Sequence, residues 1–270
     1  MRVSSRDGVD IEVHDLGGHG PPLLLAHATG FHGLVWDGFA DRVAEHFRVW
    51  SFDSRGHGRS GAGDMVWPAM ALDVLAVIDA LELDEPHGFG HSLGGAMLVL
   101  AERARPGTFR ALYLYEPAIF EPTAMRGGGN VMAEGAARRR AVFASRDAAY
   151  DNYAGKPPLN ELSPAALRAC VSHGFADLPD GTVALRCTPD AEAACFRGAE
   201  PGDAWYALSE VDVPATVARG SAEAPGPGAF ATAVARELRA EYAVVDGLGH
   251  FGPLADPAAV TASMFSAFSV

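Results

Sequence analysis

The sequence is short of positive charge. It has 21 lysine and arginine residues against 34 aspartate and glutamate residues, and its formal net charge is −13. Such an acidic surface repels phosphate backbones and anionic lipid headgroups, so we expect no nucleic-acid partner and no membrane partner. The run Arg138–Arg140 is the one obvious basic cluster, and we interpret it as a solvated helix face.

Cysteines and long apolar runs are also scarce. The three cysteines are Cys170, Cys187 and Cys195, and no two of them have Cys-x-x-Cys spacing. An odd number without such spacing predicts reduced thiols in a cytoplasmic protein rather than a disulfide framework. No stretch reaches the roughly 18 uninterrupted apolar residues of a membrane span, and the polar N-terminus is unlike a signal peptide.

The rest of the chain has the composition of a globular α/β protein. Hydrophobic residues make up 49% and charged residues 20% of the sequence. Short β-rich runs alternate with helical periods, a rhythm typical of a mostly parallel sheet. The clearest predicted strands are Leu23–Ala26, Arg48–Phe52, Ala111–Tyr115, Pro214–Arg219 and Tyr242–Val245. The clearest predicted helices are Leu34–Phe47, Trp67–Leu83, Leu93–Arg105, Ala229–Arg239 and Pro257–Phe268.

The rhythm is interrupted in the middle of the chain. From residue 118 to residue 205 strand signals are few, and short helical stretches are broken by glycine and proline. A segment of this length is too long for a loop within a compact domain. We therefore predict a helical lid at 118–205, inserted into a core formed by 1–117 and 206–270.

One motif carries most of the chemical information. The segment Gly90-His91-Ser92-Leu93-Gly94-Gly95 matches G-x-S-x-G and lies between a short predicted strand and a predicted helix. In this context the serine occupies a tight strand-to-helix turn, and the glycines leave room for its close approach to neighbouring backbone. The first helical N–H groups then point toward the reacting oxygen. The motif predicts that Ser92 is a nucleophile.

Four sequence blocks together resemble the α/β-hydrolase family, and the resemblance extends over essentially the whole chain. The blocks are Leu25–Phe31 with Trp36, Phe52–Ser60, Gly90–Gly95 and Gly247–Leu254. The resemblance implies an α/β fold with a mostly parallel eight-stranded sheet, flanking helices and a helical lid after the sixth strand. It also implies that His250 is the general base, in the family's chain order of serine, acid and histidine.

The resemblance further implies an oxyanion hole formed by the backbone N–H groups of Leu93 and Thr29. The family usually has His-Gly before the second donor, whereas this chain has His27-Ala28. The Ala28 methyl group narrows the space through which a substrate oxygen would approach, but the Thr29 N–H donor remains. From the residues themselves we infer that the Thr29 hydroxyl adds a further contact.

The acid of the triad has two candidates. Where the family typically has Gly-x-x-Asp after a late strand, this chain has Gly220-Ser221-Ala222-Glu223, so Glu223 is our first assignment. The alternative is Glu116 at the end of the strand Ala111–Tyr115, where some members of the family place a catalytic glutamate. A carboxylate that emerges from a buried strand needs a partner, which favours Glu116. The sequence leaves both open.

These residues predict a serine hydrolase that cleaves a small carboxylic ester or a related acyl bond, such as a lactone or thioester. We expect His91, Phe31, Phe175 and Phe251 to contact the small-molecule substrate, with core packing as the alternative. No metal-binding motif is present, and acyl transfer by a triad requires no cofactor. A carbon–carbon bond hydrolase, or a non-hydrolytic ligand-binding or biosynthetic protein of the same fold, remains an alternative.

Overall fold

The computed structural model describes residues 1–122, 130–198, 203–222 and 226–270. Its centre is an eight-stranded sheet with the strand order β1-β2-β4-β3-β5-β6-β10-β11. The strands β1 and β2 pair antiparallel and β2 pairs antiparallel with β4, whereas the remaining neighbours are parallel. The predicted α/β class and the mostly parallel eight-stranded sheet are therefore confirmed.

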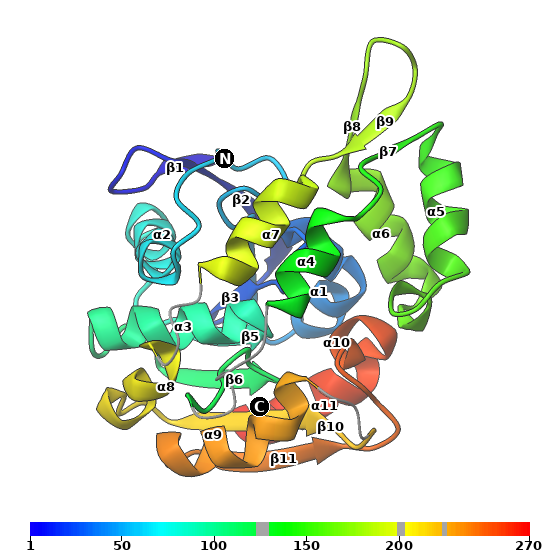
Figure 1. The fold of residues 1–270 in the computed structure, drawn as a ribbon. Helices are drawn as coiled ribbons and strands as arrows, with labels where there is room; N and C mark the ends of the chain where they lie inside the picture. Colours follow the sequence, from blue (N-terminus) through cyan, green and yellow to red (C-terminus); the bar gives the residue numbers. More distant parts are fainter. Residues whose placement is uncertain (123–129, 199–202, 223–225) are drawn as a thin grey trace.

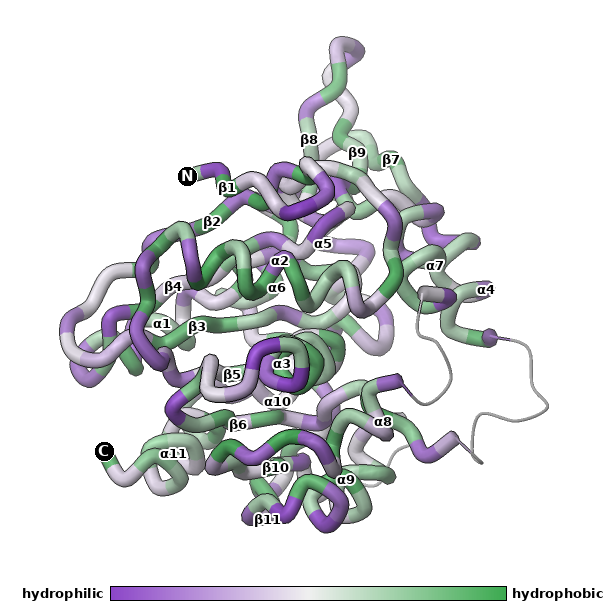
Figure 2. Tube along the Cα trace, turned by 90° about the vertical axis from the view of Figure 1, so that its left-hand side faces the viewer, coloured by the Kyte–Doolittle hydropathy of each residue, from purple (hydrophilic) through white to green (hydrophobic). Residues whose placement is uncertain are grey.

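The strands of this sheet are short and regularly spaced along the chain. They are β1 (Arg2–Ser4), β2 (Asp10–Gly18), β3 (Pro22–Ala26), β4 (Arg48–Phe52), β5 (His87–His91), β6 (Ala111–Tyr115), β10 (Ala215–Gly220) and β11 (Glu241–Val245). The central strands are buried on both faces, so they consist of continuous apolar runs rather than alternating patterns. The hydrophobic colour along β3 in Figure 2 follows from the run Leu23–Ala26.

Helices cover both faces of the sheet (Figure 1). They are α1 (Asp37–Val43), α2 (Trp67–Ala80), α3 (Leu93–Ala104), α9 (Ala231–Leu238), α10 (Gly252–Ala255) and α11 (Pro257–Phe268). One apolar cluster joins α2, α3 and α9 to the sheet, and a second joins α1 and α11 to its opposite face. The predicted helix Leu34–Phe47 is shorter in the structure, because a 3₁₀ turn over Gly33–Trp36 precedes α1.

Between β6 and β10 lies a separate group of elements, which we call the insertion. It contains α4 (Val131–Ala137), β7 (Val142–Phe143), α5 (Arg146–Ala154), α6 (Pro164–Gly174), β8 (Phe175–Asp177), β9 (Val183–Leu185), α7 (Pro189–Arg197) and α8 (Asp203–Ala207). In Figure 1 the helices α5 and α6 and the β8–β9 hairpin gather at the upper right, whereas α4 and α7 lie nearer the middle of the view. The small sheet β7-β9-β8 was not predicted, because strands of two or three residues carry no periodic pattern.

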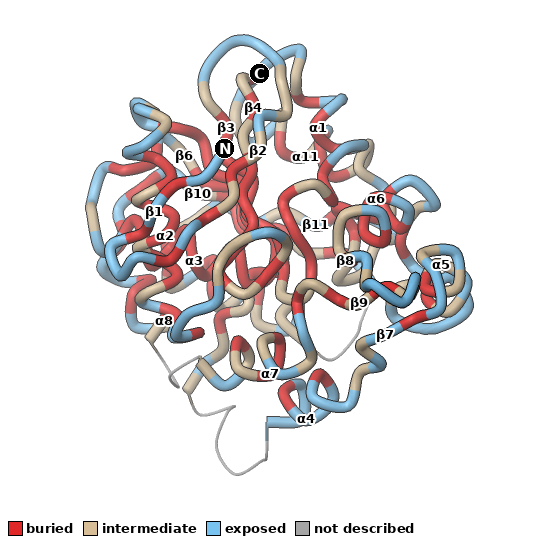
Figure 3. The backbone as a smooth tube through the Cα atoms, turned by 90° about the horizontal axis from the view of Figure 1, so that it is seen from above, coloured by how far each residue is buried: buried red, intermediate tan, exposed pale blue. Residues whose placement is uncertain are grey.

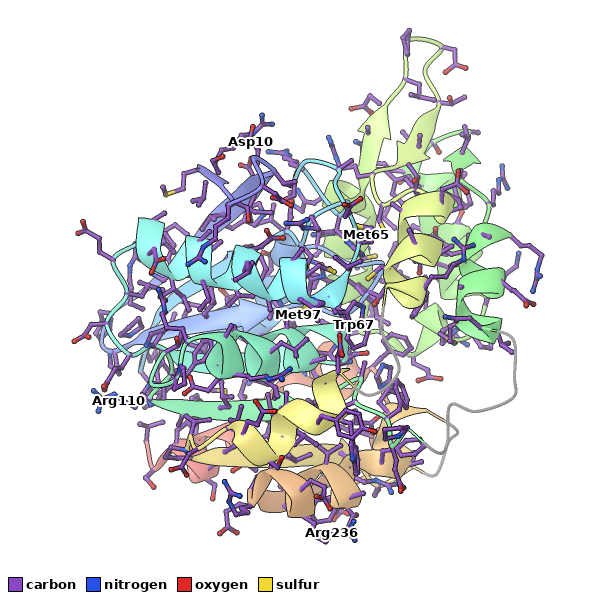
Figure 4. All side chains as sticks on the ribbon, turned by 60° about the vertical axis from the view of Figure 1, so that its left-hand side comes forward. Asp10, Met65, Trp67, Met97, Arg110 and Arg236 are labelled. Atoms are coloured by element: carbon purple, nitrogen blue, oxygen red, sulfur yellow. The ribbon has the colours of Figure 1, made fainter. Side chains whose placement is uncertain are left out.

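The insertion is joined to the core at the start of α2. The Trp67 indole donates to the Cys195 carbonyl of α7 at 3.0 Å. Met65, Trp67 and Met97 lie together at this border in Figure 4 and belong to the same apolar cluster as Cys195. In Figure 3 the central strands are buried, whereas much of α4 and α5 is exposed. Buried residues of the insertion such as Leu167 and Phe175 share one apolar cluster with Trp36 of the core.

In the part of the chain that the structure describes, we find no helix both long and apolar enough to cross a membrane. Cys170, Cys187 and Cys195 are all buried, and none of them forms a disulfide. Burial raises the pKa of the Cys170 thiol to about 11, so this thiol stays protonated at neutral pH.

Candidate active site

Ser92 lies at the turn between β5 and α3, in the elbow that the motif predicts. Its backbone angles are φ 54° and ψ −114°, a combination that non-glycine residues rarely adopt. The glycines around it are required for space, since a Cβ on Gly90 would lie 2.5 Å from the Gly95 Cα, and one on Gly94 would lie 2.1 Å from the Ala26 oxygen. The strained turn is therefore held by close backbone packing on both sides.

Backbone hydrogen bonds tie this turn to the end of β6. The Ser92 N–H donates to the Tyr115 carbonyl at 3.1 Å, and the Ala118 N–H donates to the Ser92 carbonyl at 2.9 Å. Glu116 directly follows Tyr115 at the end of β6, has a φ of 42° and is 4% exposed. The elbow and Glu116 thus occupy adjacent strand ends whose relative position is fixed by the main chain.

The Glu116 carboxylate contacts His250. Its Oε2 lies 2.9 Å from His250 Nδ1, and its Oε1 accepts a hydrogen bond from the Gly220 N–H at 3.1 Å. An ionised carboxylate only accepts, so Nδ1 carries the proton of a neutral His250 and Nε2 is the nitrogen available as a base. A Cβ on Gly228 would lie 2.7 Å from Oε1, so the carboxylate fits closely into its surroundings.

The other acid candidate, Glu223, lies outside the described residues, as do Ala224 and Pro225. The strand that leads toward it, β10, ends at Gly220 as the family pattern implies, one residue beyond the predicted boundary. What the described part of this region contributes to the site is the Gly220 N–H that holds Glu116.

Two buried side chains hold the loop that carries His250. The Tyr115 hydroxyl donates to the Gly249 carbonyl at 2.9 Å, and the His91 Nε2 donates to the His250 carbonyl at 2.8 Å. Tyr115 and His91 are both fully buried, and burial lowers the pKa of His91, so its ring is neutral. This placement favours a positioning role for His91 over the substrate contact expected from the sequence.

The proposed oxyanion donors come from two neighbouring segments. Leu93 is the first residue of α3, where backbone N–H groups have no partner within the helix. Thr29 lies in the loop after β3, which is braced by His27. That ring donates from Nδ1 to the Ala28 carbonyl at 2.8 Å and accepts at Nε2 from the Ser54 N–H at 2.9 Å. Burial lowers the pKa of His27 to about 3, so the brace is uncharged.

The Thr29 hydroxyl has a contact that the sequence could not indicate. Its Oγ1 lies 3.9 Å from the Cys195 Sγ of α7. Sulfur is a weak hydrogen-bond partner, so this contact leaves the hydroxyl free to rotate toward another acceptor. The loop that carries Thr29 is therefore packed directly under the insertion.

The three predicted aromatic contacts fall into two groups. Phe31 and Phe251 lie beside each other with ring centroids 5.9 Å apart, and Phe251 also packs on the His250 ring at 5.3 Å. Phe175 is 1% exposed and packs edge-on against Phe143 in the insertion. Phe31 and Phe175 nevertheless line one small cavity under the insertion. Phe251 is thus adjacent to the candidate base, whereas Phe175 shares a cavity with Phe31 and packs within the insertion.

Comparison with known proteins identifies the family. The model for the "Alpha/beta hydrolase family" matches residues 23–263. This chain belongs to the α/β-hydrolase family. The four sequence blocks on which the resemblance was based therefore indicated the right family.

Several relatives of this α/β-hydrolase are hydrolases by name. It is 34% identical over 101 residues to the pimeloyl-[acyl-carrier protein] methyl ester esterase of Methylococcus capsulatus, covering 37% of this chain and 38% of the relative. It is 32% identical over 122 residues to the N-formylmaleamate deformylase of Pseudomonas putida, covering 44% and 45%. The chain therefore spans less than half the length of these curated relatives.

Solved structures resemble the α/β-hydrolase over its full length. E-2-(acetamidomethylene)succinate hydrolase superposes with a TM-score of 0.83 at 22% identity, covering 100% of this chain and 98% of that protein. At this level of identity the likeness establishes the shared fold.

Sequence reasoning missed two polar residues of the α/β-hydrolase at this site. Arg139 is not on a solvated helix face as predicted, because α4 ends at Ala137 and the Arg139 side chain is only 26% exposed. It forms an ion pair with Glu192 of α7. Its neighbour Arg138 is 71% exposed, so no signal in the run Arg138–Arg140 distinguishes the buried member.

Proposed function

We propose that this α/β-hydrolase cleaves a small carboxylic ester or a related acyl bond, with Ser92 as nucleophile, His250 as general base and Glu116 as the acid. The observation that carries the proposal is the 2.9 Å contact between Glu116 Oε2 and His250 Nδ1, next to a serine held in a strained elbow. Nucleophile, base and orienting carboxylate are the three roles that covalent acyl transfer requires.

In the first half-reaction His250 Nε2 takes the Ser92 hydroxyl proton while Oγ attacks the substrate carbonyl carbon. The tetrahedral intermediate then collapses, the carbon–oxygen bond to the leaving group breaks, and the leaving group takes the proton from His250. In the second half-reaction a water gives its proton to His250 and attacks the acyl-enzyme, which releases the acid and restores Ser92. Throughout, Glu116 holds the imidazole in one tautomer and stabilises the imidazolium.

The negative charge on the intermediate needs preorganised donors. The backbone N–H groups of Leu93 and Thr29 are our candidates, because one opens α3 and the other lies in the braced loop after β3. Donors fixed by the backbone cost no reorganisation during the reaction. Removal of one such donor in comparable enzymes typically slows turnover by about 10²- to 10³-fold.

We prefer Glu116 to Glu223 as the acid. Glu116 is buried, already contacts His250 Nδ1 and accepts a second hydrogen bond from Gly220. A buried carboxylate without these partners would be strongly unfavourable, so its placement makes sense as an imidazole partner. Glu223 then serves as a surface or structural carboxylate in this proposal.

The names of the relatives support an acyl substrate, but they do not decide whether the leaving group is bound through oxygen or nitrogen. One relative is named for a methyl ester and another for an N-formyl group, so both carbon–oxygen and carbon–nitrogen acyl bonds occur among them. We favour the oxygen esters because an alkoxide leaves more readily than an amide nitrogen. A carbon–carbon bond hydrolase and a non-hydrolytic binding protein are the competing functions. We further propose that the insertion acts as a lid over the substrate.

The direct test is covalent trapping of Ser92. A fluorophosphonate probe should label the wild-type chain and leave Ser92→Ala unlabelled, and a short-chain p-nitrophenyl ester should give a burst of p-nitrophenol followed by turnover. Labelling without any ester or thioester turnover would favour the non-hydrolytic alternative. Labelling at a residue other than Ser92 would refute the proposed mechanism.

A further inference from the structure

A buried histidine holds the peptide unit that carries the Thr29 N–H. His27 directly follows β3, and its side chain is fully buried. Its Nδ1 lies 2.8 Å from the Ala28 carbonyl oxygen, and its Nε2 lies 2.9 Å from the Ser54 nitrogen. Ser54 follows β4, which pairs in parallel with β3, so the ring bridges the loops after two adjacent strands. The proposed reaction has no proton transfer that involves this ring.

The two main-chain partners determine which nitrogen of the His27 ring carries the proton. A carbonyl oxygen only accepts, so Nδ1 carries the proton that is donated to Ala28. A backbone N–H only donates, so Nε2 is the bare nitrogen that accepts from Ser54. Burial, with a smaller contribution from the adjacent His57, lowers the pKa of His27 to about 3, so the ring binds no second proton at neutral pH. The ring is therefore held as one neutral tautomer.

The Ala28 carbonyl also closes a tight turn. It accepts from the Phe31 N–H at 3.2 Å, and Gly30 has a φ of +83°, the left-handed conformation typical of the third residue of a type II turn. Thr29 is the second residue of this turn. In the part of the chain that the structure describes, we find no main-chain acceptor for the Thr29 N–H, so this donor is available to a ligand.

The planarity of the peptide unit links this carbonyl to the proposed oxyanion donor. The Ala28 carbonyl and the Thr29 N–H belong to one trans peptide unit, so they point in opposite directions. A hydrogen bond that fixes the carbonyl therefore also fixes the direction of the N–H, and it polarises that N–H into a stronger donor. The end of β3 lies against the first turn of α3, since a Cβ on Gly94 would lie 2.1 Å from the Ala26 oxygen. The Thr29 and Leu93 donors thus come from neighbouring segments.

We propose that His27 is a positioning residue for the oxyanion hole. Its neutral ring, in the tautomer that the Ser54 N–H selects, orients the Ala28–Thr29 peptide so that the Thr29 N–H faces the carbonyl oxygen of the substrate. The inference rests on the proposed function, because the oxyanion belongs to the same acyl transfer. In this role the ring neither touches the substrate nor exchanges a proton with it. It acts on the charge that develops in the transition state, so its loss should lower kcat more than it raises KM.

Two substitutions separate the two hydrogen bonds of the ring. Asparagine carries its amide where histidine has Nδ1, so His27→Asn can still donate to the Ala28 carbonyl. Glutamine carries its amide one atom further along the side chain, where histidine has Nε2, so His27→Gln can accept from Ser54 but does not hold the Ala28 carbonyl. For a p-nitrophenyl ester we expect His27→Gln to lower kcat by about tenfold to hundredfold, less than the loss of a whole oxyanion donor. His27→Asn should stay within about threefold of the wild type.

The thiono analogue of the same ester, in which sulfur replaces the carbonyl oxygen, distinguishes positioning from a general structural effect. Sulfur is a weak acceptor, so cleavage of the thiono ester depends little on the donors of the oxyanion hole. The ratio of kcat/KM for the oxygen ester to kcat/KM for the thiono ester should fall by at least about fivefold in His27→Gln and stay unchanged in His27→Asn. A merely structural loss would lower both rates together. The matched control is His87→Gln, which replaces another buried histidine at the opposite end of β5 from the elbow and should leave the ratio unchanged.

A second measurement needs no active variant. Nitrogen-15 NMR of the wild-type protein should show the His27 ring with a protonated Nδ1 and a bare Nε2 throughout the range from about pH 8 to about pH 5, where an unperturbed histidine would become charged. A protonated Nε2, or a charged ring at the lower pH, would refute the inference.

The outcomes separate the inference from the proposed function. If the wild type cleaves esters and His27→Gln keeps the wild-type ratio, or if the ratio falls as far in His27→Asn, the positioning role is refuted and the serine mechanism stands. If no acyl substrate is turned over and Ser92 is not labelled by the fluorophosphonate, the proposed function fails, and the role of His27 fails with it. If His27→Gln does not fold, the tautomer in the wild type and the ratio in His27→Asn still decide the question.

Discussion

The sheet and the insertion hold their functional groups in different ways. At the carboxyl ends of the interior strands, Ser92, Glu116 and the His250 loop are fixed by hydrogen bonds that involve the main chain, such as Ser92 N–H to the Tyr115 carbonyl and Gly220 N–H to Glu116. In the insertion, Arg139 is held by the side chains of Glu192 and Tyr153. The main-chain contact at the elbow persists when neighbouring side chains change, whereas a side-chain pair such as Arg139–Glu192 is lost with one substitution.

This difference assigns separate tasks to the two regions. The sheet places reacting atoms with the precision that a chemical step demands, because small displacements of such groups are costly. If the insertion covers the substrate as we propose, its replaceable side chains suit it to substrate choice. Substitutions in the sheet should therefore lower turnover for every substrate, and substitutions in the insertion should change the ranking of substrates.

The largest expected effect is on the sheet side. Ser92→Ala should lower kcat by on the order of 10³-fold or more, because no other group can form the acyl-enzyme. Its unfolding midpoint in urea should stay close to that of the wild type, since the hydroxyl contributes little to packing. Steady-state assays with several esters would check this, and residual turnover above about a tenth of wild type would remove Ser92 from the mechanism.

The next effect distinguishes the two acid candidates. Glu116→Gln keeps the size of the side chain but removes the charge that stabilises the imidazolium, so kcat should fall by about 10²- to 10⁴-fold. Glu223→Gln should stay within about tenfold of wild type. Both single variants and the double variant should be assayed together, because nearby groups are not additive. The reverse order of effects would move the acid to Glu223.

A smaller effect is expected at the clamp on the His250 loop. Tyr115→Phe removes the hydroxyl that bonds the Gly249 carbonyl, and we expect kcat to fall by about tenfold with a stability loss of roughly 1 kcal/mol. Tyr113→Phe is the matched control, since its equally buried hydroxyl bonds Ser263 at 2.7 Å, away from the site. That control should lose comparable stability and keep its kcat. Equal kcat values in both variants would contradict the clamp.

The smallest effect concerns the junction between the two regions. His32 in the core donates from Nε2 to the Cys170 carbonyl of α6 at 3.2 Å. Burial, outweighing the nearby Asp53, lowers its pKa from 6.5 to about 4. The unfolded chain therefore binds a proton that the folded chain does not, so this group makes the free energy of unfolding fall as the pH is lowered from 6.5 toward 4.

Replacing this histidine should reduce that dependence. In His32→Gln the slope of unfolding free energy against pH should decrease by up to about 1.4 kcal/mol per pH unit, measured by urea denaturation between pH 7.5 and 5. His19→Gln, which changes an exposed histidine, is the control and should keep the wild-type slope. An unchanged slope in His32→Gln would mean that folding does not keep the His32 ring neutral at this junction.

Prediction from the sequence succeeded for features that depend on local spacing. It failed for contacts between segments that are distant in the chain. The strand Ala111–Tyr115, the helix start at Leu93 and the elbow could be predicted because glycines and apolar runs report on their own neighbourhood. The choice between Glu116 and Glu223 stayed open, because the contact of Glu116 with His250 depends on how β6, β10 and β11 pair. Arg139 was misjudged for the same reason, since its partner Glu192 lies in another helix.

The hydrogen bond from the Gly220 N–H to Glu116 has a consequence for how such sequences diverge. If Glu116 is the acid, nucleophile and acid are supplied by two neighbouring strands, and what the described end of β10 supplies to the acid is the main-chain N–H of Gly220. The donor position itself requires glycine, because a Cβ on Gly220 would lie 2.0 Å from the Leu248 carbonyl oxygen. The side chains after Gly220 are then released from selection for the role of the acid, so this stretch can drift in sequence while the carboxylate at the end of β6 is inherited.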